Sequence, residues 1–149
     1  MNRVQSFVIS LIIFFTFIPN LLACGALDGR GLHCTVSKND NDDINGYSIG
    51  HESFFYFQGK EVLEPYFRAD ETPIMIGNNN LGVYYLDSEI MKWGEETYFL
   101  NRANLELRKV DAGNIYFNCE LISNPLRKIM KYFQPKIDEV KSSMARMNK

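Results

Sequence analysis

Three cysteines, Cys24, Cys34 and Cys119, have the most distinctive chemistry in this 149-residue chain. A thiol can form a disulfide, carry a lipid or stay reduced, and an odd count leaves one thiol to explain in an oxidising compartment. A Cys34–Cys119 bond would close a loop of about 85 residues and stabilise the fold by about 4 kcal/mol. The alternative is a Cys24–Cys34 bond, which would leave the Cys119 thiol in an apolar strand.

An acidic segment has the spacing of a calcium-binding loop. Positions 1, 3, 5, 6 and 12 of an EF-hand-like loop are occupied by Asn41, Asp43, Asn45, Gly46 and Glu52. The first position holds Asn in place of the usual Asp, and the flanking segments have the pattern of strands. We therefore expect an acidic hairpin turn around Asn45-Gly46. Asn41, Asp43, Asn45 and Glu52 are weak candidates for calcium ligands.

The two histidines, His33 and His51, are candidate bases of a hydrolytic site. Such a site needs a nucleophile, a base and an orienting acid in contact. A zinc site needs three or four ligands, and the sequence has neither HExxH nor a paired CxxC. We expect both histidines at the surface, no catalytic residue, no cofactor and no enzymatic activity. A secreted hydrolase is the least favoured alternative.

Residues 1–23 have the order of an export signal. Arg3 supplies the positive charge, an apolar run extends from Phe7 to Ile18, and small residues begin at Ala23. The run is about 12 residues long, shorter than the roughly 20 that a membrane-spanning helix needs. We therefore predict a cleaved signal peptide and an exported mature chain. An uncleaved membrane anchor is the less favoured alternative.

The end of this segment, Leu21-Leu22-Ala23-Cys24, resembles the lipobox of bacterial lipoproteins, whose cysteine becomes the lipid-modified N-terminus. Leu22 departs from the pattern, which has a small residue at that position. The resemblance implies a lipid on Cys24, which would leave Cys34 and Cys119 to pair. Cleavage nearby by the ordinary signal peptidase is the alternative, and it implies a soluble secreted protein.

Charge is distributed unevenly along the mature chain. Residues 24–125 carry eight Lys and Arg against 16 Asp and Glu, a net charge of −8. Residues 126–149 carry seven against two, a net charge of +5. Nucleic-acid binding needs a concentrated positive surface, so the acidic body is not expected to bind nucleic acid.

Residues 32–122 have the pattern of short strands separated by turns. Alternation places Cys34 on the apolar face of the first strand and Cys119 on the apolar face of the last, where a disulfide across the core could form. Six further strands are predicted between them, at 53–58, 61–68, 81–86, 89–93, 97–101 and 104–109. Seven to eight successive strands indicate a mainly β domain, an antiparallel meander closed as a barrel or folded as a sandwich.

Four consecutive aromatic residues, Phe54 to Phe57, must divide between the two faces of their strand. In a barrel they could line a cavity for an apolar ligand. In a sandwich, one pair could lie in the core and the other under the C-terminal helix. We favour core or helix packing over a ligand cavity.

Residues 123–149 are predicted to form a basic amphipathic helix. Asn124-Pro125 is typical of a helix start, and apolar residues follow at helical spacing. Pro135 is expected to kink or restart the helix. Such a helix packs its apolar stripe on the β body, or it lies on an anionic membrane or a partner. The candidates for that contact are Arg127, Lys128, Lys131 and Lys136.

Three segments resemble small exported β-proteins of bacteria. These segments are the region around Trp93, residues 100–107 (LNRANLEL) and residues 116–121 (YFNCEL). An early strand cysteine, a mid-chain Trp, an [IL]NRxxLxL hairpin and a terminal cysteine-bearing strand recur in those proteins. The resemblance covers residues 32–122 and implies a β fold and an exported location, with no activity or catalytic residue attached.

These patterns together predict an exported envelope protein with a 24–31 linker, a 32–122 β domain and a helical tail. We expect a lipid tether in the periplasm, at the outer membrane or at the cell surface, and a non-catalytic binding or structural role. The expected partners are the membrane, through the lipid, and an unknown envelope protein. The alternatives are a lipocalin-like binder of an apolar small molecule and a secreted inhibitor of an envelope or wall-degrading enzyme.

Overall fold

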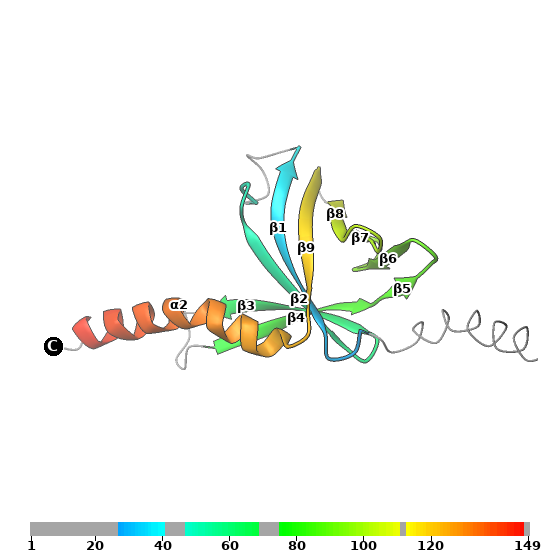
Figure 1. Ribbon diagram of the computed structural model, residues 1–149. Helices are drawn as coiled ribbons and strands as arrows, with labels where there is room; N and C mark the ends of the chain where they lie inside the picture. Colours follow the sequence, from blue (N-terminus) through cyan, green and yellow to red (C-terminus); the bar gives the residue numbers. More distant parts are fainter. Residues whose placement is uncertain (1–26, 41–46, 69–74, 111–112, 148–149) are drawn as a thin grey trace, which may run out of the picture.

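The computed structural model describes residues 27–40, 47–68, 75–110 and 113–147. These residues form nine antiparallel strands and one helix (Figure 1). The strands are β1 (Gly31–Asn39), β2 (Glu52–Gln58), β3 (Glu61–Arg68), β4 (Met75–Val83), β5 (Tyr85–Leu86), β6 (Ile90–Trp93), β7 (Tyr98–Asn101), β8 (Glu106–Val110) and β9 (Asn114–Ile122). The helix is α2 (Pro125–Met147), at the C-terminal end.

The strands form one sheet that closes almost completely on itself. β4 pairs with β3, β5 pairs with β6, and only Tyr84 separates β4 from β5, so one bent segment belongs to both ends of the sheet. At the bend, the Tyr84 N–H donates to the Lys60 carbonyl and the Gly94 N–H donates to the Leu81 carbonyl, both at 3.0 Å. The predicted mainly β meander is confirmed, and it is barrel-like.

Apolar side chains fill the interior of the barrel. Alternation along β2 turns Phe55 and Phe57 inward, where their ring centroids lie 5.6 Å and 6.5 Å from that of Trp93. Trp93 also stacks on Tyr98 at 5.4 Å. None of these four residues is more than 5% exposed. They are core residues, as favoured above, and their packing gives no support to a lipocalin-like cavity among them.

Helix α2 packs on the outer face of the same sheet. Phe54 points outward from β2 and forms a second buried cluster with Ile129 and Phe133 of the helix. Phe133 also stacks on Phe67 of β3, with a centroid distance of 6.0 Å. The aromatic run of β2 is therefore divided between the barrel interior and the helix. In Figure 1 the second half of α2 extends past the ends of β3 and β4.

Helix α2 begins where the sequence predicts but is not interrupted at Pro135. Asn124 Oδ1 accepts a hydrogen bond from the Arg127 N–H at 3.3 Å, so Asn124 caps the helix as its residue type predicts. Pro135 lies inside the helix, which continues to Met147, so the predicted restart at Pro135 is wrong. Phe133 and Ile137 contact the same cluster on either side of the proline, and this packing holds the two halves together.

The start of β4 was not predicted, because the sequence pattern places a strand only from Leu81. The segment 75–80 contains Gly77 and three asparagines, residue types that are depleted in strands. Pairing with β3 makes it a strand, and the Tyr66 ring packs directly over Gly77, where a Cβ would collide with it. β3 itself contains Pro65, which is tolerated because the β2–β3 register ends at Tyr56↔Leu63, before the proline.

Candidate functional site

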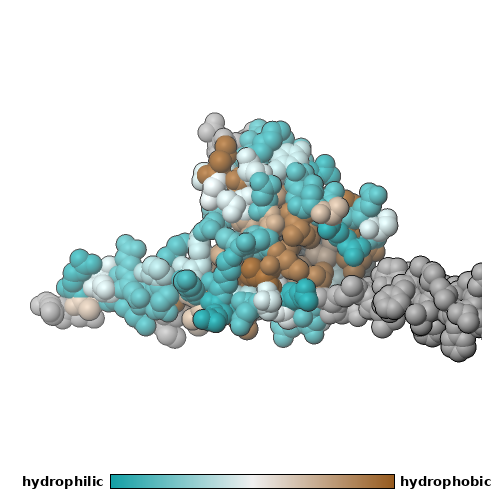
Figure 2. Space-filling model, viewed as in Figure 1, coloured by the Kyte–Doolittle hydropathy of each residue, from teal (hydrophilic) through white to brown (hydrophobic). Residues whose placement is uncertain are grey.

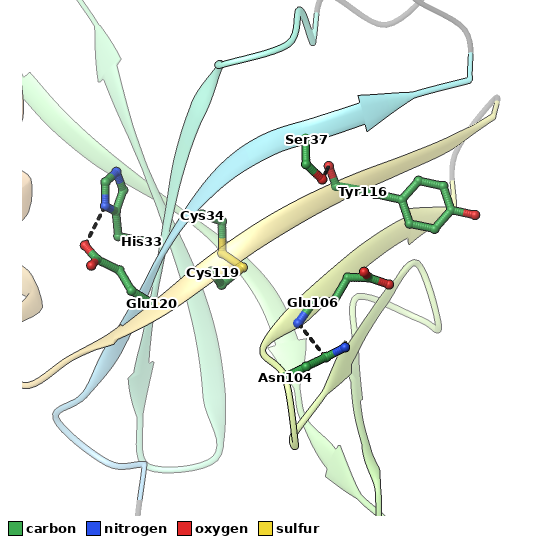
Figure 3. Close-up of a disulfide and its surroundings, with 8 residues drawn as sticks. All are labelled: His33, Cys34, Ser37, Asn104, Glu106, Tyr116, Cys119 and Glu120. Atoms are coloured by element: carbon green, nitrogen blue, oxygen red, sulfur yellow. Dashed lines mark hydrogen bonds and ion pairs between the residues drawn. A yellow bond between two sulfur atoms is a disulfide. The ribbon is translucent and has the colours of Figure 1, made fainter.

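The disulfide joins the first and last long strands of the barrel. Cys34 and Cys119 are directly registered partners of β1 and β9, with a Cα–Cα distance of 4.0 Å, and their sulfurs are bonded (Figure 3). The pair is the one that the sequence predicts. The expectation of a bond across the core is wrong, because β1 and β9 are neighbours and the bond links adjacent strands.

His33 anchors a group of charged side chains on the outside of β1. Its ring stacks on Phe54 at 4.6 Å, its Nε2 lies 2.8 Å from Glu52 Oε1, and its Nδ1 lies 2.9 Å from Glu120 Oε1 (Figure 3). Glu120 also accepts a hydrogen bond from the Lys128 ammonium of α2. The hydrogen bond from Lys128, and after it the one from His33, lower the pKa of Glu120. We name His33, Glu52, Glu120 and Lys128 the His33 cluster.

The His33 cluster connects β1, β2 and β9 to helix α2. His33 is on the polar face, as predicted, but only 16% of its side chain is exposed. The four members include a base and two acids but no Ser, Thr or Cys to act as a nucleophile. The cluster can therefore hold the helix against the barrel, and it lacks the attacking group that hydrolysis by a Ser-His or Cys-His site requires.

The second histidine lies in the loop before β2. His51 is exposed, and its ring meets Tyr47 edge-on at 5.1 Å. Residues 46–50, Gly-Tyr-Ser-Ile-Gly, match the G-x-S-x-G string of hydrolases, although Ser48 is not among the predicted site residues. A nucleophile elbow needs a strand followed by a helix, whereas residues 47–50 precede strand β2. Within the described residues the Ser48 hydroxyl has no hydrogen bond to a histidine.

Of the four calcium candidates, the structure describes only Glu52. Asn41, Asp43 and Asn45 lie outside the described residues, and Glu52 is engaged with His33 at 2.8 Å. Among the residues that the structure describes, no group of three or more His, Cys, Asp and Glu side chains is placed to hold a metal ion.

The four basic residues singled out on α2 do not form one common surface. Lys128 pairs with Glu120, and the Lys136 ammonium lies 5.0 Å from the Tyr132 ring and 5.6 Å from the Phe133 ring. Arg127 and Lys131 are exposed. The lipidation candidate Cys24 lies outside the described residues. No helix in the described ranges is long and apolar enough to span a bilayer.

A polar group inside the barrel was missed from the sequence. Glu64 points inward from β3, and burial raises its pKa, while the Lys109 charge and a hydrogen bond from Asn79 oppose that shift. The Lys109 ammonium lies 4.7 Å from the Tyr47 ring and 5.7 Å from the Tyr98 ring. Side chains two residues apart share a face of a strand, so an inward Val62 places Glu64 inward as well. This signal was not used, because a single acidic residue in a strand is usually exposed.

A strained turn joins β6 to β7. The Thr97 N–H donates to the Gly94 carbonyl at 3.0 Å, and the central residues Glu95 and Glu96 have φ values of 54° and 65°. Two positive φ values are the requirement of a type I′ turn, which favours Asn-Gly over residues with a long side chain. The turn borders a surface hollow of about 350 Å³ that also contacts Tyr85 and Trp93.

Comparison with family models, with curated proteins and with solved structures finds no match for this chain. Function must therefore be inferred from the chain's own residues. The two features that bear on it are the Cys34–Cys119 disulfide and the attachment of α2 to the barrel.

Proposed function

We propose that this chain is an exported, non-catalytic envelope protein, a small β-barrel tethered by a lipid on Cys24. The observation that carries the proposal is the Cys34–Cys119 disulfide. Disulfides persist in oxidising compartments outside the cytosol, and this bond uses two of the three cysteines. Cys24 is then the odd thiol, and it follows a segment that resembles a lipobox.

A binding or structural role fits the barrel better than catalysis does. The interior around Trp93 is packed with aromatic rings. The charged groups of the His33 cluster pair with one another, and the Lys128–Glu120 pair attaches α2 to the barrel. The resemblance to small exported β-proteins of bacteria over residues 32–122 implies the β fold and the exported location, with no activity attached. The packed interior disfavours the alternative of a lipocalin-like binder.

Mass spectrometry of the mature protein, purified from a bacterial envelope, tests the tether. We expect an N-terminal peptide that begins at Cys24 and carries the added mass of the lipid. We also expect the protein to sediment with membranes. The matched Cys24→Ser variant should be soluble and unmodified, while its Cys34–Cys119 bond remains intact. An unmodified N-terminus at any other residue would show that the tether is wrong.

A further inference from the structure

The first described residues and the start of α2 lie at the same end of the barrel. A surface hollow of about 410 Å³ is lined by Asp28 and Gly29 together with Ser123 to Leu126. Asp28 Oδ1 accepts the Gly59 N–H at 2.7 Å, and the Gly29 N–H donates to the Phe57 carbonyl at 3.0 Å. Asp28 and Gly29 are therefore fixed to the barrel beside the helix start.

The tether site is close to this end of the barrel because few residues intervene. Cys24 is four residues before Asp28, and an extended chain covers at most about 3.3–3.6 Å per residue. A lipid on Cys24 would thus lie within about 14 Å of Asp28. The surface of the bilayer that holds this lipid would then be near Asp28 and the first turn of α2.

The first turns of α2 expose apolar side chains on a face that the barrel does not cover. Leu126 is 59% exposed and Met130 is 48% exposed, whereas Ile129 and Phe133 are buried against the sheet. Met144, 18 residues after Leu126, continues the same face because an α-helix has 3.6 residues per turn. We call these three residues, Leu126, Met130 and Met144, the apolar ridge.

The charges around the apolar ridge complement an anionic surface. Arg127, Lys131 and Lys141 are exposed on the helix, and residues 126–149 have a net charge of +5 against −8 for residues 24–125. Anionic lipids attract each nearby Lys or Arg and repel the acidic barrel. In Figure 2 the visible face of the projecting helix is mainly hydrophilic.

We infer that α2 lies on the anionic surface of the bilayer that holds the Cys24 lipid, with Leu126 and Met130 inserted among the headgroups. The inference rests on the proposed tether. A flexible lipid anchor alone leaves the barrel free to rotate. Contact through the apolar ridge would give the barrel one orientation on the membrane.

Sedimentation with vesicles tests the contact without the lipid. The mature chain with Cys24→Ser should bind vesicles of phosphatidylethanolamine and phosphatidylglycerol, bind phosphatidylcholine vesicles much more weakly, and dissociate at high salt. Leu126→Ser combined with Met130→Ser should lower the partition coefficient about tenfold. Arg127→Gln combined with Lys131→Gln should lower it by about as much.

The matched control is Val83→Ser combined with Tyr85→Ser. These residues are 42% and 71% exposed on β4 and β5, away from the helix, so their replacement should leave binding unchanged. Equal binding by the Leu126/Met130 double variant, or equal binding to both kinds of vesicle, would overturn the inference. Neither result bears on the tether, because the mass of the mature N-terminus decides that separately.

A fluorescence measurement on the lipidated protein gives an independent readout. Leu126→Trp should be quenched by brominated lipids in reconstituted vesicles, whereas Tyr85→Trp should not. Quenching of both residues, or of Tyr85→Trp alone, would contradict the proposed orientation. The native Trp93 is 1% exposed and contributes the same background to both variants.

Discussion

Among single residues, Glu64 is an inward carboxyl group whose ionised form the fold disfavours. Burial raises its pKa above the ordinary 4.5, and Lys109 and Asn79 offset this only in part. Because the folded state binds the proton more tightly, the stability that Glu64 contributes is present below its unfolded pKa. That contribution is lost as pH rises through the folded value. At neutral pH the residue therefore weakens the fold.

Glu64→Gln should raise the free energy of unfolding by about 1 kcal/mol near pH 7. The gain should shrink as pH falls below the ordinary pKa of 4.5, because wild-type Glu64 is then protonated. Urea unfolding followed by Trp93 fluorescence at several pH values measures the difference. Glu61→Gln is the control, since Glu61 is exposed on the same strand. A variant less stable than wild type at neutral pH would contradict the prediction.

At the scale of elements, two features shape this barrel: the bent β4–β5 segment and the hairpin of β6 and β7 that meets it. The Gly94 N–H bonds to the Leu81 carbonyl at 3.0 Å, so the β6–β7 turn is part of the closure. Glu95 and Glu96 in that turn have φ values of 54° and 65°. Non-glycine residues pay roughly 1–2 kcal/mol for this conformation, so the closure contains local strain.

Replacing Glu95-Glu96 by Asn-Gly should relieve the strain. We expect Glu95→Asn combined with Glu96→Gly to raise the free energy of unfolding by about 1–2 kcal/mol, because these residues suit a type I′ turn. Chemical unfolding at equilibrium measures the change. The Glu95→Gln, Glu96→Gln variant removes the charges and keeps the strain, so its stability should stay within about 0.5 kcal/mol of wild type. Equal gains in both variants would attribute the effect to charge.

For the whole molecule, the β1–β9 pairing joins the first and last described strands of the chain. β1 and β9 share a long register, from Gly31↔Ile122 to Asn39↔Ile115, and the disulfide lies within it. The cysteines are 85 residues apart in the chain. Removing such a cross-link enlarges the unfolded ensemble more than it disturbs the folded sheet, because the strands keep their hydrogen bonds.

Cys34→Ala combined with Cys119→Ala should therefore fold but lose about 3–4 kcal/mol of stability. Urea unfolding of the variant, compared with oxidised and reduced wild type, measures the loss. The reduced wild type should resemble the variant. A loss below about 1 kcal/mol would mean that the cross-link does not constrain the unfolded chain as proposed.

Local patterns predicted much of this fold because they depend on residues close together in sequence. Alternation with a period of two placed Cys34 and Cys119 on apolar strand faces. Helical spacing placed Ile129 and Phe133 on one stripe. These assignments hold in the structure, where Cys34, Ile129 and Phe133 are buried. The same local patterns missed β4 before Leu81, because Gly77 and its neighbouring asparagines have weak strand propensity.

Only the tertiary structure decided how these faces meet. It placed Cys119 directly beside Cys34, turned Phe54 toward α2, and brought Lys109 close enough to Glu64 to affect its pKa. The physical reason is that register between strands distant in sequence is set by long-range pairing and shared burial. The sequence by itself determined which side chains are apolar and on which face each lies. The closed sheet determined which partner each face has.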